Sequence, residues 1–81
     1  MQKYLMCVGE TARVGCADDS ATTIKDTAEQ AMAEAMGWAT EMAWPESDDA
    51  YDAYVWIERD GQIVAKEQVH IYASGRLSLP A

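Results

Sequence analysis

The sequence predicts an α+β domain in which a single antiparallel sheet carries one helix on one of its faces. In the first and last thirds of the chain, apolar and polar residues alternate, which is typical of half-buried strands. In the middle third, apolar residues recur every three or four positions, which is typical of an amphipathic helix. The 81 residues have room for a single domain, residues 1–81, with one core. We therefore expect two hairpins, four to five strands and one helix, in the order β-β-α-(β)-β-β.

Residues 3–8 and 11–17 are expected to form the first hairpin. A Gly-Glu dipeptide separates them, and glycine at the first position of a two-residue loop favours a type II′ turn. In this register Cys7 and Cys16 share a face of the sheet but lie roughly 13 Å apart along the ladder, which is too far for a disulfide. We expect both cysteines to be small buried hydrophobic residues.

The helix is expected to begin between Ala21 and Thr23, after two carboxylates of the kind that a helix N-terminus favours. Its apolar stripe recurs at alternating steps of four and three and consists of Ile24, Ala28, Ala31, Ala35, Trp38 and Met42. Gly37 leaves two alternatives for the end of the helix. Either the helix stops there and residues 38–44 form a strand, or it continues until shortly before Pro45. The strand is the preferred interpretation.

Residues 51–58 and 62–72 are expected to form the second hairpin, around an Arg-Asp-Gly loop that fits three residues with glycine in the left-handed position. That loop pairs Ile57 with Ile63. The apolar face toward the helix then consists of Ala53, Val55, Ile57, Ile63, Ala65, Val69 and Ile71. The other face carries Tyr54, Trp56, Glu58, Val64, Lys66, Gln68, His70 and Tyr72. Residues 73–81 either fray or add a short edge strand.

The charge of the chain limits the classes of partner. Fourteen acidic residues against six basic ones give a net charge of −8, and such a field repels phosphate and favours encounter with basic surfaces. Direct binding to nucleic acid or to an anionic membrane is therefore disfavoured. The first residues do not resemble a signal peptide, and no stretch approaches the ~20 apolar residues that cross a bilayer. We expect a cytoplasmic protein of a bacterial host.

The sequence gives little support for catalysis. It lacks a Ser, His and Asp set in a recognisable order, a glycine-rich phosphate loop and a metal-ligand motif. With two cysteines and one histidine, four nitrogen or sulfur ligands for a structural zinc are not available. We expect no enzymatic activity, no cofactor and no metal site.

Two surfaces are candidates for binding a partner. The first is the sheet face away from the helix, where Tyr54 and Trp56 lie among polar residues, as in interface hot spots; Trp44 and Tyr51 are further candidate anchors. The second is a ridge of carboxylates, spaced about 5 to 6 Å apart on the helix, which imitates a row of phosphates. On the helix it includes Asp26, Glu29, Glu34 and, if the helix continues beyond Gly37, Glu41, and from the loops it includes Asp18, Asp19, Glu46, Asp48, Asp49 and Asp52. Each surface has an ordinary alternative: the tail, the first hairpin or a second copy covers the sheet face, and the ridge is a solvated helix face.

An Ala/Met-rich segment, residues 27–36, is combined with a hairpin sequence that contains Glu58-Arg59-Asp60-Gly61. In this organisation, its small size and its acidity, the chain resembles the phage-encoded anti-CRISPR proteins that act on type I surveillance complexes. The resemblance implies an inhibitor that binds a multi-subunit Cas complex and either blocks access of target DNA or prevents recruitment of the nuclease.

We therefore expect a non-enzymatic inhibitor of a CRISPR-Cas complex or of a similar nucleic-acid-handling defence complex, which binds by acidic mimicry of nucleic acid. The alternative is a homo-oligomeric structural or accessory protein of a phage or bacterium, in which the open sheet face is the subunit interface. A third alternative is a protein that binds a small ligand or a peptide between helix and sheet, and no feature of the sequence favours it.

Overall fold

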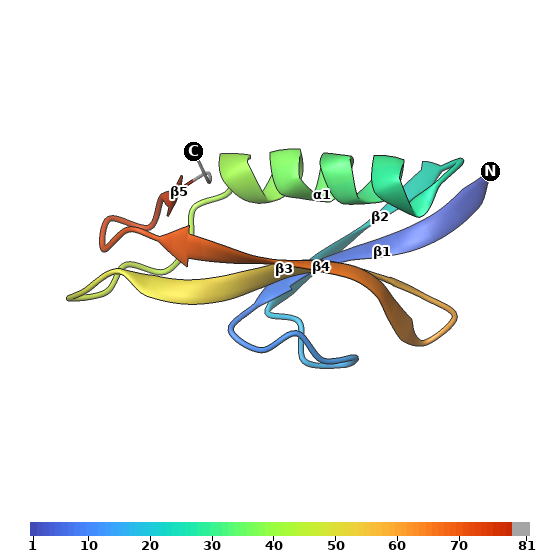
Figure 1. Ribbon diagram of the computed structural model, residues 1–81. Coiled ribbons are helices and arrows are strands. Elements are labelled where there is room, and N and C mark those ends of the chain that lie inside the picture. Colours follow the sequence, from blue (N-terminus) through green and yellow to red (C-terminus); the bar gives the residue numbers. More distant parts are fainter. Residues whose placement is uncertain (79–81) are drawn as a thin grey trace.

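The computed structural model describes residues 1–78 and confirms the predicted fold class. Five strands form one curled antiparallel sheet in the order β2-β1-β3-β4-β5, and a single helix covers one face of it (Figure 1). The elements along the chain are β1 (Gln2–Gly9), β2 (Asp19–Lys25), α1 (Ala28–Glu41), β3 (Tyr51–Arg59), β4 (Gln62–Ile71) and β5 (Leu77–Ser78). The described chain contains one helix, α1, which is neither long nor apolar enough to cross a membrane.

The first hairpin exists, but its predicted second strand is wrong. Residues 10–18 form a loop, and β1 pairs instead with β2, from Gln2 opposite Lys25 to Val8 opposite Asp19. The segment that was predicted to begin the helix therefore forms a strand. Its three consecutive β-branched residues, 22–24, favour extended backbone. The helix begins later, after the N-cap residue Thr27, whose hydroxyl accepts a hydrogen bond of 3.2 Å from the backbone N–H of Gln30.

The helix continues through Gly37 to Glu41, so the predicted strand at residues 38–44 is also wrong. The inner face of α1 consists of Ala31, Ala35 and Ala39, all fully buried, and the last turn is needed to bury Ala39. Gly37 lies on the exposed side, where no other atom lies within 4 Å of an added Cβ. Burial of one more turn of the apolar face outweighs the low helix propensity of one glycine.

The second hairpin has a shorter turn than predicted. Asp60 and Gly61 form a two-residue loop in which both have positive φ, 54° and 74°, as a type I′ turn requires. Ile57 lies opposite Ala65 rather than the predicted Ile63, because the register shifts at a bulge between Ile57 and Glu58. Beyond the bulge the pairing has moved by two positions, so Ala53, Val55, Ile57, Ala65, Val69 and Ile71 keep their predicted face. Between the turn and the bulge it has moved by only one position, and Ile63 lies opposite Glu58, whose side chain is on the face away from α1. The prediction that Ile63 faces the helix is therefore wrong.

The core lies between α1 and one face of the sheet. β1 contributes Tyr4, Met6 and Val8, and the residues from the other strands are Ala53, Val55, Ile57, Val69, Ile71 and Leu77. The small alanine face of α1 allows the helix to lie close to this layer of larger side chains. The prediction of a single helix-covered apolar face, with Ala53, Val55, Ile57, Val69 and Ile71 in it, is confirmed.

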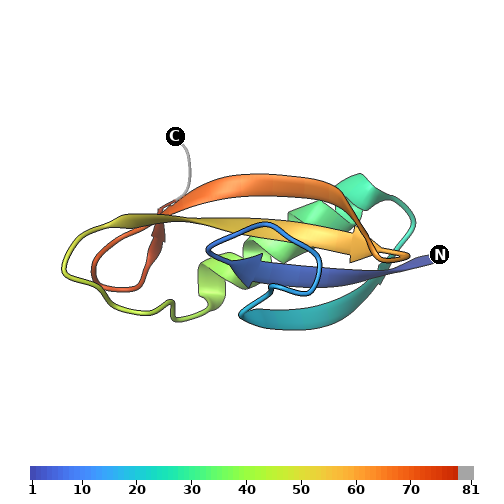
Figure 2. The same ribbon diagram turned by 90° about the horizontal axis from the view of Figure 1, so that it is seen from below.

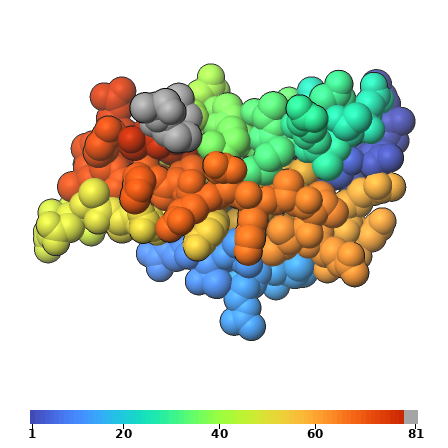
Figure 3. All heavy atoms as spheres, viewed as in Figure 1, coloured from blue at the N-terminus to red at the C-terminus, as the bar shows by residue number. Residues whose placement is uncertain are grey.

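The last strand, β5, contacts α1. β5 pairs with the end of β4, with Leu77 opposite Ile71, which confirms the short edge strand for residues 77–78; residues 79–81 of the predicted tail lie outside the described part of the chain. In the space-filling view, α1 and β5 lie above the sheet, and the loop between β1 and β2 protrudes below it (Figure 3).

Candidate functional site

Most of the negative charge is concentrated at one end of the molecule. The molecule is elongated, 41 × 25 × 17 Å, and β1 runs toward the half of the sheet in which β3 starts and α1 ends. In Figure 1 the loop before β3 lies at the far left, and the loop between β1 and β2 lies below the middle of the sheet; Asp18 and Asp19 line one groove with Trp44 and Pro45. This arrangement brings eight exposed carboxylates to one surface. We call this surface the acidic end; it consists of Glu10, Asp18, Asp19, Glu41, Glu46, Asp48, Asp49 and Asp52. Four of the predicted partner-binding residues, Glu46, Asp48, Asp49 and Asp52, therefore belong to one surface.

Few cations compensate these carboxylates. Within residues 1–78, the ion pair at this end joins Asp52 to Nδ1 of His70, its neighbour across the β3–β4 ladder. Arg76 lines the same shallow groove as Glu41, and it forms no ion pair with another residue of the described chain, residues 1–78. The other carboxylates of the acidic end are therefore free to interact with a partner.

Backbone hydrogen bonds hold the loop at this end, residues 42–50. The N–H of Trp44 donates to the carbonyl of Gly75 at 3.0 Å, and the N–H of Ser47 donates to the carbonyl of Ala73 at 3.1 Å. Gly75 has a φ of 83°, and a Cβ there would overlap the carbonyl oxygen of Trp44, so only glycine fits. Trp44, a predicted anchor, is buried, and its indole N–H donates to the carbonyl of Ala39 at 2.9 Å.

Tyr51 follows this loop and lies near the loop between β1 and β2, whose Asp18 lines one groove together with Trp44 and Pro45. Its hydroxyl donates to the carbonyl of Pro45 at 2.7 Å. Partial burial raises the pKa of Tyr51, and the negative charges of Glu10 and Asp18 raise it further. The two loops therefore approach each other around Tyr51, and the carboxylates of both belong to one electrostatic surface.

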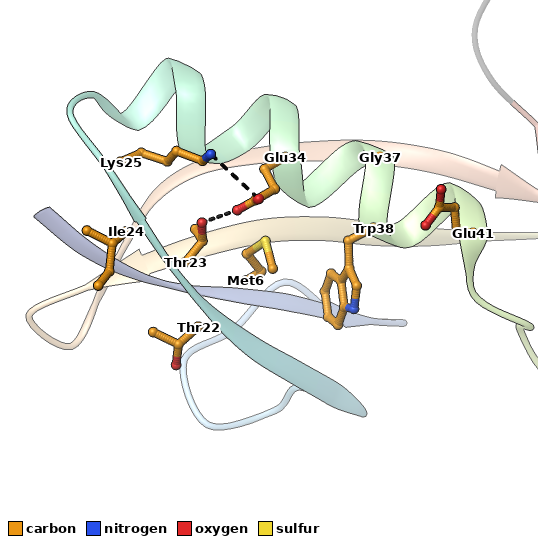
Figure 4. A pocket seen from close by; sticks show the side chains of 9 residues that line it. All are labelled: Met6, Thr22, Thr23, Ile24, Lys25, Glu34, Gly37, Trp38 and Glu41. Carbon is orange, nitrogen blue, oxygen red and sulfur yellow. Dashed lines mark hydrogen bonds and ion pairs between the residues drawn. The ribbon is translucent and has the colours of Figure 1, made fainter. Parts of the chain in front are cut away.

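Two of the predicted helix carboxylates do not belong to the acidic end. Glu29 lies in the first turn of α1, roughly 18 Å from Glu41 at the helical rise. Glu34 accepts a hydrogen bond from the hydroxyl of Thr23 and lies 3.6 Å from Nζ of Lys25 (Figure 4). The hydrogen bond from Thr23 and the charge of Lys25 lower the pKa of Glu34. The predicted ridge is therefore interrupted, and these carboxylates serve the helix and its contact with β2.

Trp56 is not the exposed anchor that the sequence predicted. It is fully buried, because the loop of residues 10–18 crosses the sheet face opposite α1 (Figure 2). A Cβ on Gly9 would lie 3.2 Å from the indole ring and 3.3 Å from the carbonyl of Cys16, so this glycine allows the loop to close over Trp56. Tyr54, the other predicted anchor on this face, is half-buried.

Under this loop, Trp56 forms a polar cluster with Glu58 and Cys7. The indole N–H donates to Oε2 of Glu58 at 2.8 Å, and Sγ of Cys7 lies 3.6 Å from the same oxygen. Burial, the charge of Glu58 and this hydrogen bond together raise the pKa of Cys7 to about 12. The thiol therefore stays protonated at neutral pH, which makes it a poor nucleophile.

Sequence reasoning missed this cluster, although Trp56 and Glu58 lie two residues apart on one strand and therefore on one face. A buried indole N–H needs an acceptor, and this spacing could have identified one. The prediction that both cysteines are buried is wrong for Cys16, which is exposed on the loop.

No protein-family model, curated protein or solved structure matches this chain. Residues 1–78 contain no group of three or more His, Cys, Asp or Glu side chains that could hold a metal ion.

Proposed function

We propose that this protein is a non-enzymatic inhibitor that binds a basic surface of a nucleic-acid-handling complex through its acidic end. The observation that carries the proposal is the eight exposed carboxylates at this end, of which Asp52 alone contacts a basic side chain, that of His70, within residues 1–78. Like charges held close together repel one another, and a surface rich in Lys and Arg relieves this repulsion while it gains attraction.

Complexes that hold nucleic acid present such surfaces, because they neutralise phosphates with Lys and Arg. A protein that places carboxylates in that groove competes with nucleic acid for the same cations. The resemblance to anti-CRISPR proteins makes a type I CRISPR-Cas surveillance complex the first partner to test. Binding in the nucleic-acid groove blocks target DNA, and binding beside it blocks recruitment of the nuclease.

The sheet face opposite α1 has less support as the binding surface. Trp56 is buried under the loop of residues 10–18, and Tyr54 is half-buried, so the aromatic hot spot that motivated this surface is largely covered. The same observation weakens the alternative of a homo-oligomer through the open sheet face. The acidic end needs no rearrangement to meet a partner.

The test compares two double charge reversals with the same net charge. The variant Asp48→Lys/Asp49→Lys changes the acidic end, and Asp26→Lys/Glu67→Lys changes exposed residues outside it. The wild type is first used to capture partners from a bacterial lysate that contains CRISPR and restriction complexes, and the Kd for the purified complex is then measured at low and high salt. We expect the first variant to bind at least roughly tenfold more weakly, with a flatter salt dependence, and the second to retain most of the affinity.

Unchanged affinity of Asp48→Lys/Asp49→Lys would contradict the proposed surface. An equal loss in both variants would show that only net charge matters, and would contradict a specific role for this end. If no nucleic-acid-handling complex is captured by the wild type, the proposed class of partner is wrong.

A further inference from the structure

The two edges of the sheet differ in their protection against pairing with another strand. The long edge strand β4 has a bulge and the charged residues Lys66 and Glu67, and β5 covers its last residues. These features prevent the addition of a strand. The other edge strand, β2, pairs only with β1 among the strands of residues 1–78. Between its terminal residues Asp19 and Lys25, it has no charged residue, no proline and no bulge in its pairing with β1.

The sequence of β2 is complementary to itself in the antiparallel direction. When Thr22 is placed on a two-fold axis, Asp19 of each copy lies opposite Lys25 of the other, and Ala21 lies opposite Thr23. The axis itself brings two Thr22 residues together. Opposite charges and threonine pairs stabilise neighbouring strands, whereas like charges directly opposite each other destabilise them. A shift of this register by one residue in one direction places Asp19 opposite Asp26, which is repulsive. A shift in the other direction places Asp18 opposite Lys25, but it turns the second copy over, so that the two helices lie on opposite sides of the sheet.

The exposed side chains agree with this register. Asp19 and Thr22 are exposed, and Ile24 is 56% exposed although it is large and apolar. In this register an odd-numbered residue always lies opposite an odd-numbered residue, and an even-numbered one opposite an even-numbered one. Because side chains alternate along a strand, the residues that face α1 in one copy lie opposite residues that face α1 in the other. The two copies therefore carry their helices on the same side of one continuous sheet.

A groove beside β2 provides room for contact between the two helices. It has a volume of about 740 Å³ and runs between β2 and α1 (Figure 4). Met6 and Trp38 contribute apolar surface to its lining, and the indole of Trp38 extends from α1 toward β2. In the paired arrangement the grooves of the two copies meet at the axis, where half-buried Trp38 side chains gain further apolar contact.

The distribution of charge favours the same arrangement. Antiparallel pairing places the start of β2, at the acidic end of one copy, beside the end of β2 in the other. Lys25 lies there, together with Lys3, which is opposite Ile24 in the β1–β2 ladder. The carboxylates of residues 46–52 lie on the loop before β3 and on β3, which β1 separates from β2. They stay accessible in the pair.

We propose that two copies of this chain associate through their β2 strands, antiparallel about a two-fold axis at Thr22, to form one continuous ten-stranded sheet. This symmetric contact uses the same patch on both copies. It uses one carboxylate of the acidic end, Asp19, and leaves those of residues 46–52 accessible, so the dimer presents these carboxylates at two opposite sides.

Sedimentation equilibrium over the micromolar to millimolar range tests the proposal. The wild type is expected to form dimers. Asp19→Lys and Lys25→Asp each replace both attractive pairs of the dimer with repulsive ones, so each alone is expected to weaken self-association by roughly tenfold or more. Because these substitutions change the net charge in opposite directions, an effect of net charge alone cannot weaken both. A mixture of the two variants is expected to restore dimers, since every mixed pair again places a lysine opposite an aspartate at both charge positions.

Two further variants complete the test. Lys66→Asp makes the same charge change on the β4 edge and is expected to leave the dimer intact. Lys25→Asp also removes the ion pair with Glu34, so circular dichroism must first show that the variant folds. If Lys25→Asp does not fold, Thr22→Lys replaces it in the test. Thr22 is exposed, and the substitution places two lysines opposite each other at the two-fold axis. A monomeric wild type, dimers that persist in Asp19→Lys or in Thr22→Lys, or a mixture that stays monomeric would each overturn the proposal.

Discussion

The two ends of this molecule carry charge in different ways. At the end where β1 begins and β3 finishes, charged side chains form contacts with one another: Lys25 with Glu34 at 3.6 Å, Arg59 with Asp60 at 3.8 Å, and the N-terminal amine with Asp26 at 3.9 Å. Arg59 also donates to Gln2 at 2.6 Å. We call this the paired end. At the acidic end, by contrast, the single contact of this kind within residues 1–78 joins Asp52 to His70.

The acidic end is held together without its carboxylates. Its contacts are hydrogen bonds to backbone carbonyls, from Trp44, Ser47 and Tyr51, and the close packing of Gly75 against Trp44. At this end, the residues that stabilise the fold are therefore different from the residues that carry the negative charge. Its carboxylates can therefore be replaced without loss of the fold, whereas its turn residues cannot.

The largest effect is expected from Gly75→Ala. Gly15 and Gly75 have the same φ of 83°, but only Gly75 has neighbouring atoms where the Cβ would lie. The alanine at position 15 should cost about 1 kcal/mol of unfolding free energy for its left-handed backbone. At position 75, overlap with the carbonyl of Trp44 should bring the loss to about 3 kcal/mol. Urea denaturation of both variants measures the difference, and equal losses would show that the packing of Trp44 on Gly75 does not hold this end.

The second hairpin and the start of the helix illustrate what the sequence could and could not predict. Alternation in β3 and β4 identified the core face, because the two-residue periodicity survives any shift of register by two positions. The type I′ turn at Asp60-Gly61 and the adjacent bulge depend on backbone dihedral angles that an Arg-Asp-Gly sequence does not determine. The start of the helix was misplaced because Ile24 fits the helical period as well as it fits a strand. The β-branched neighbours of Ile24 decided between the two.

A smaller effect is expected from Tyr51→Phe. The substitution removes the hydrogen bond to the carbonyl of Pro45 and leaves the ring in place, which should cost about 1 kcal/mol of unfolding free energy. Tyr72→Phe is the matched control, because Tyr72 is 55% exposed and its hydroxyl forms no hydrogen bond within residues 1–78. Urea denaturation of the two variants side by side gives the comparison. A loss in the control as large as in Tyr51→Phe would mean that the hydrogen bond from Tyr51 to Pro45 does not stabilise the loop of residues 42–50.

Acid should weaken the paired end through Glu34. Because the pKa of Glu34 is lowered in the folded protein from its ordinary value of 4.5, the ionised carboxylate stabilises the fold above about pH 4.5, and this contribution is lost as the pH falls through the folded pKa. In Glu34→Gln, the stability should fall less steeply with acid. The control is Glu29→Gln on the same helix. Measurements of thermal unfolding between neutral and acidic pH give the slopes, and identical slopes in the wild type and Glu34→Gln would contradict the contact.

The sequence predicted that the candidate site is acidic, but it did not predict all of the residues that belong to it. The cluster of Glu46, Asp48, Asp49 and Asp52 is local in sequence, so the sequence located it. Asp18 was also assigned to the predicted ridge, but Glu10 was not. The contribution of Glu10 depends on how the loop between β1 and β2 folds back toward Tyr51, and local patterns do not determine such a path. The same loop buries Trp56, which explains why an aromatic residue on the polar face was mistaken for an exposed anchor.

The smallest effect is expected from Asp48→Asn/Asp49→Asn. This variant should raise the unfolding free energy, whereas a loss of charge at the paired end should lower it. If these carboxylates repel their neighbours and have no partner, their removal should raise the unfolding free energy by a few tenths of a kcal/mol at low salt, and added salt should abolish the gain. At the paired end, Lys25→Gln should lower the unfolding free energy by a similar amount, because it leaves Glu34 without its cation. Urea denaturation at two salt concentrations measures both. A loss of stability in the aspartate variant would mean that these carboxylates support the loop, and the reduced binding of Asp48→Lys/Asp49→Lys could then no longer be attributed to charge alone.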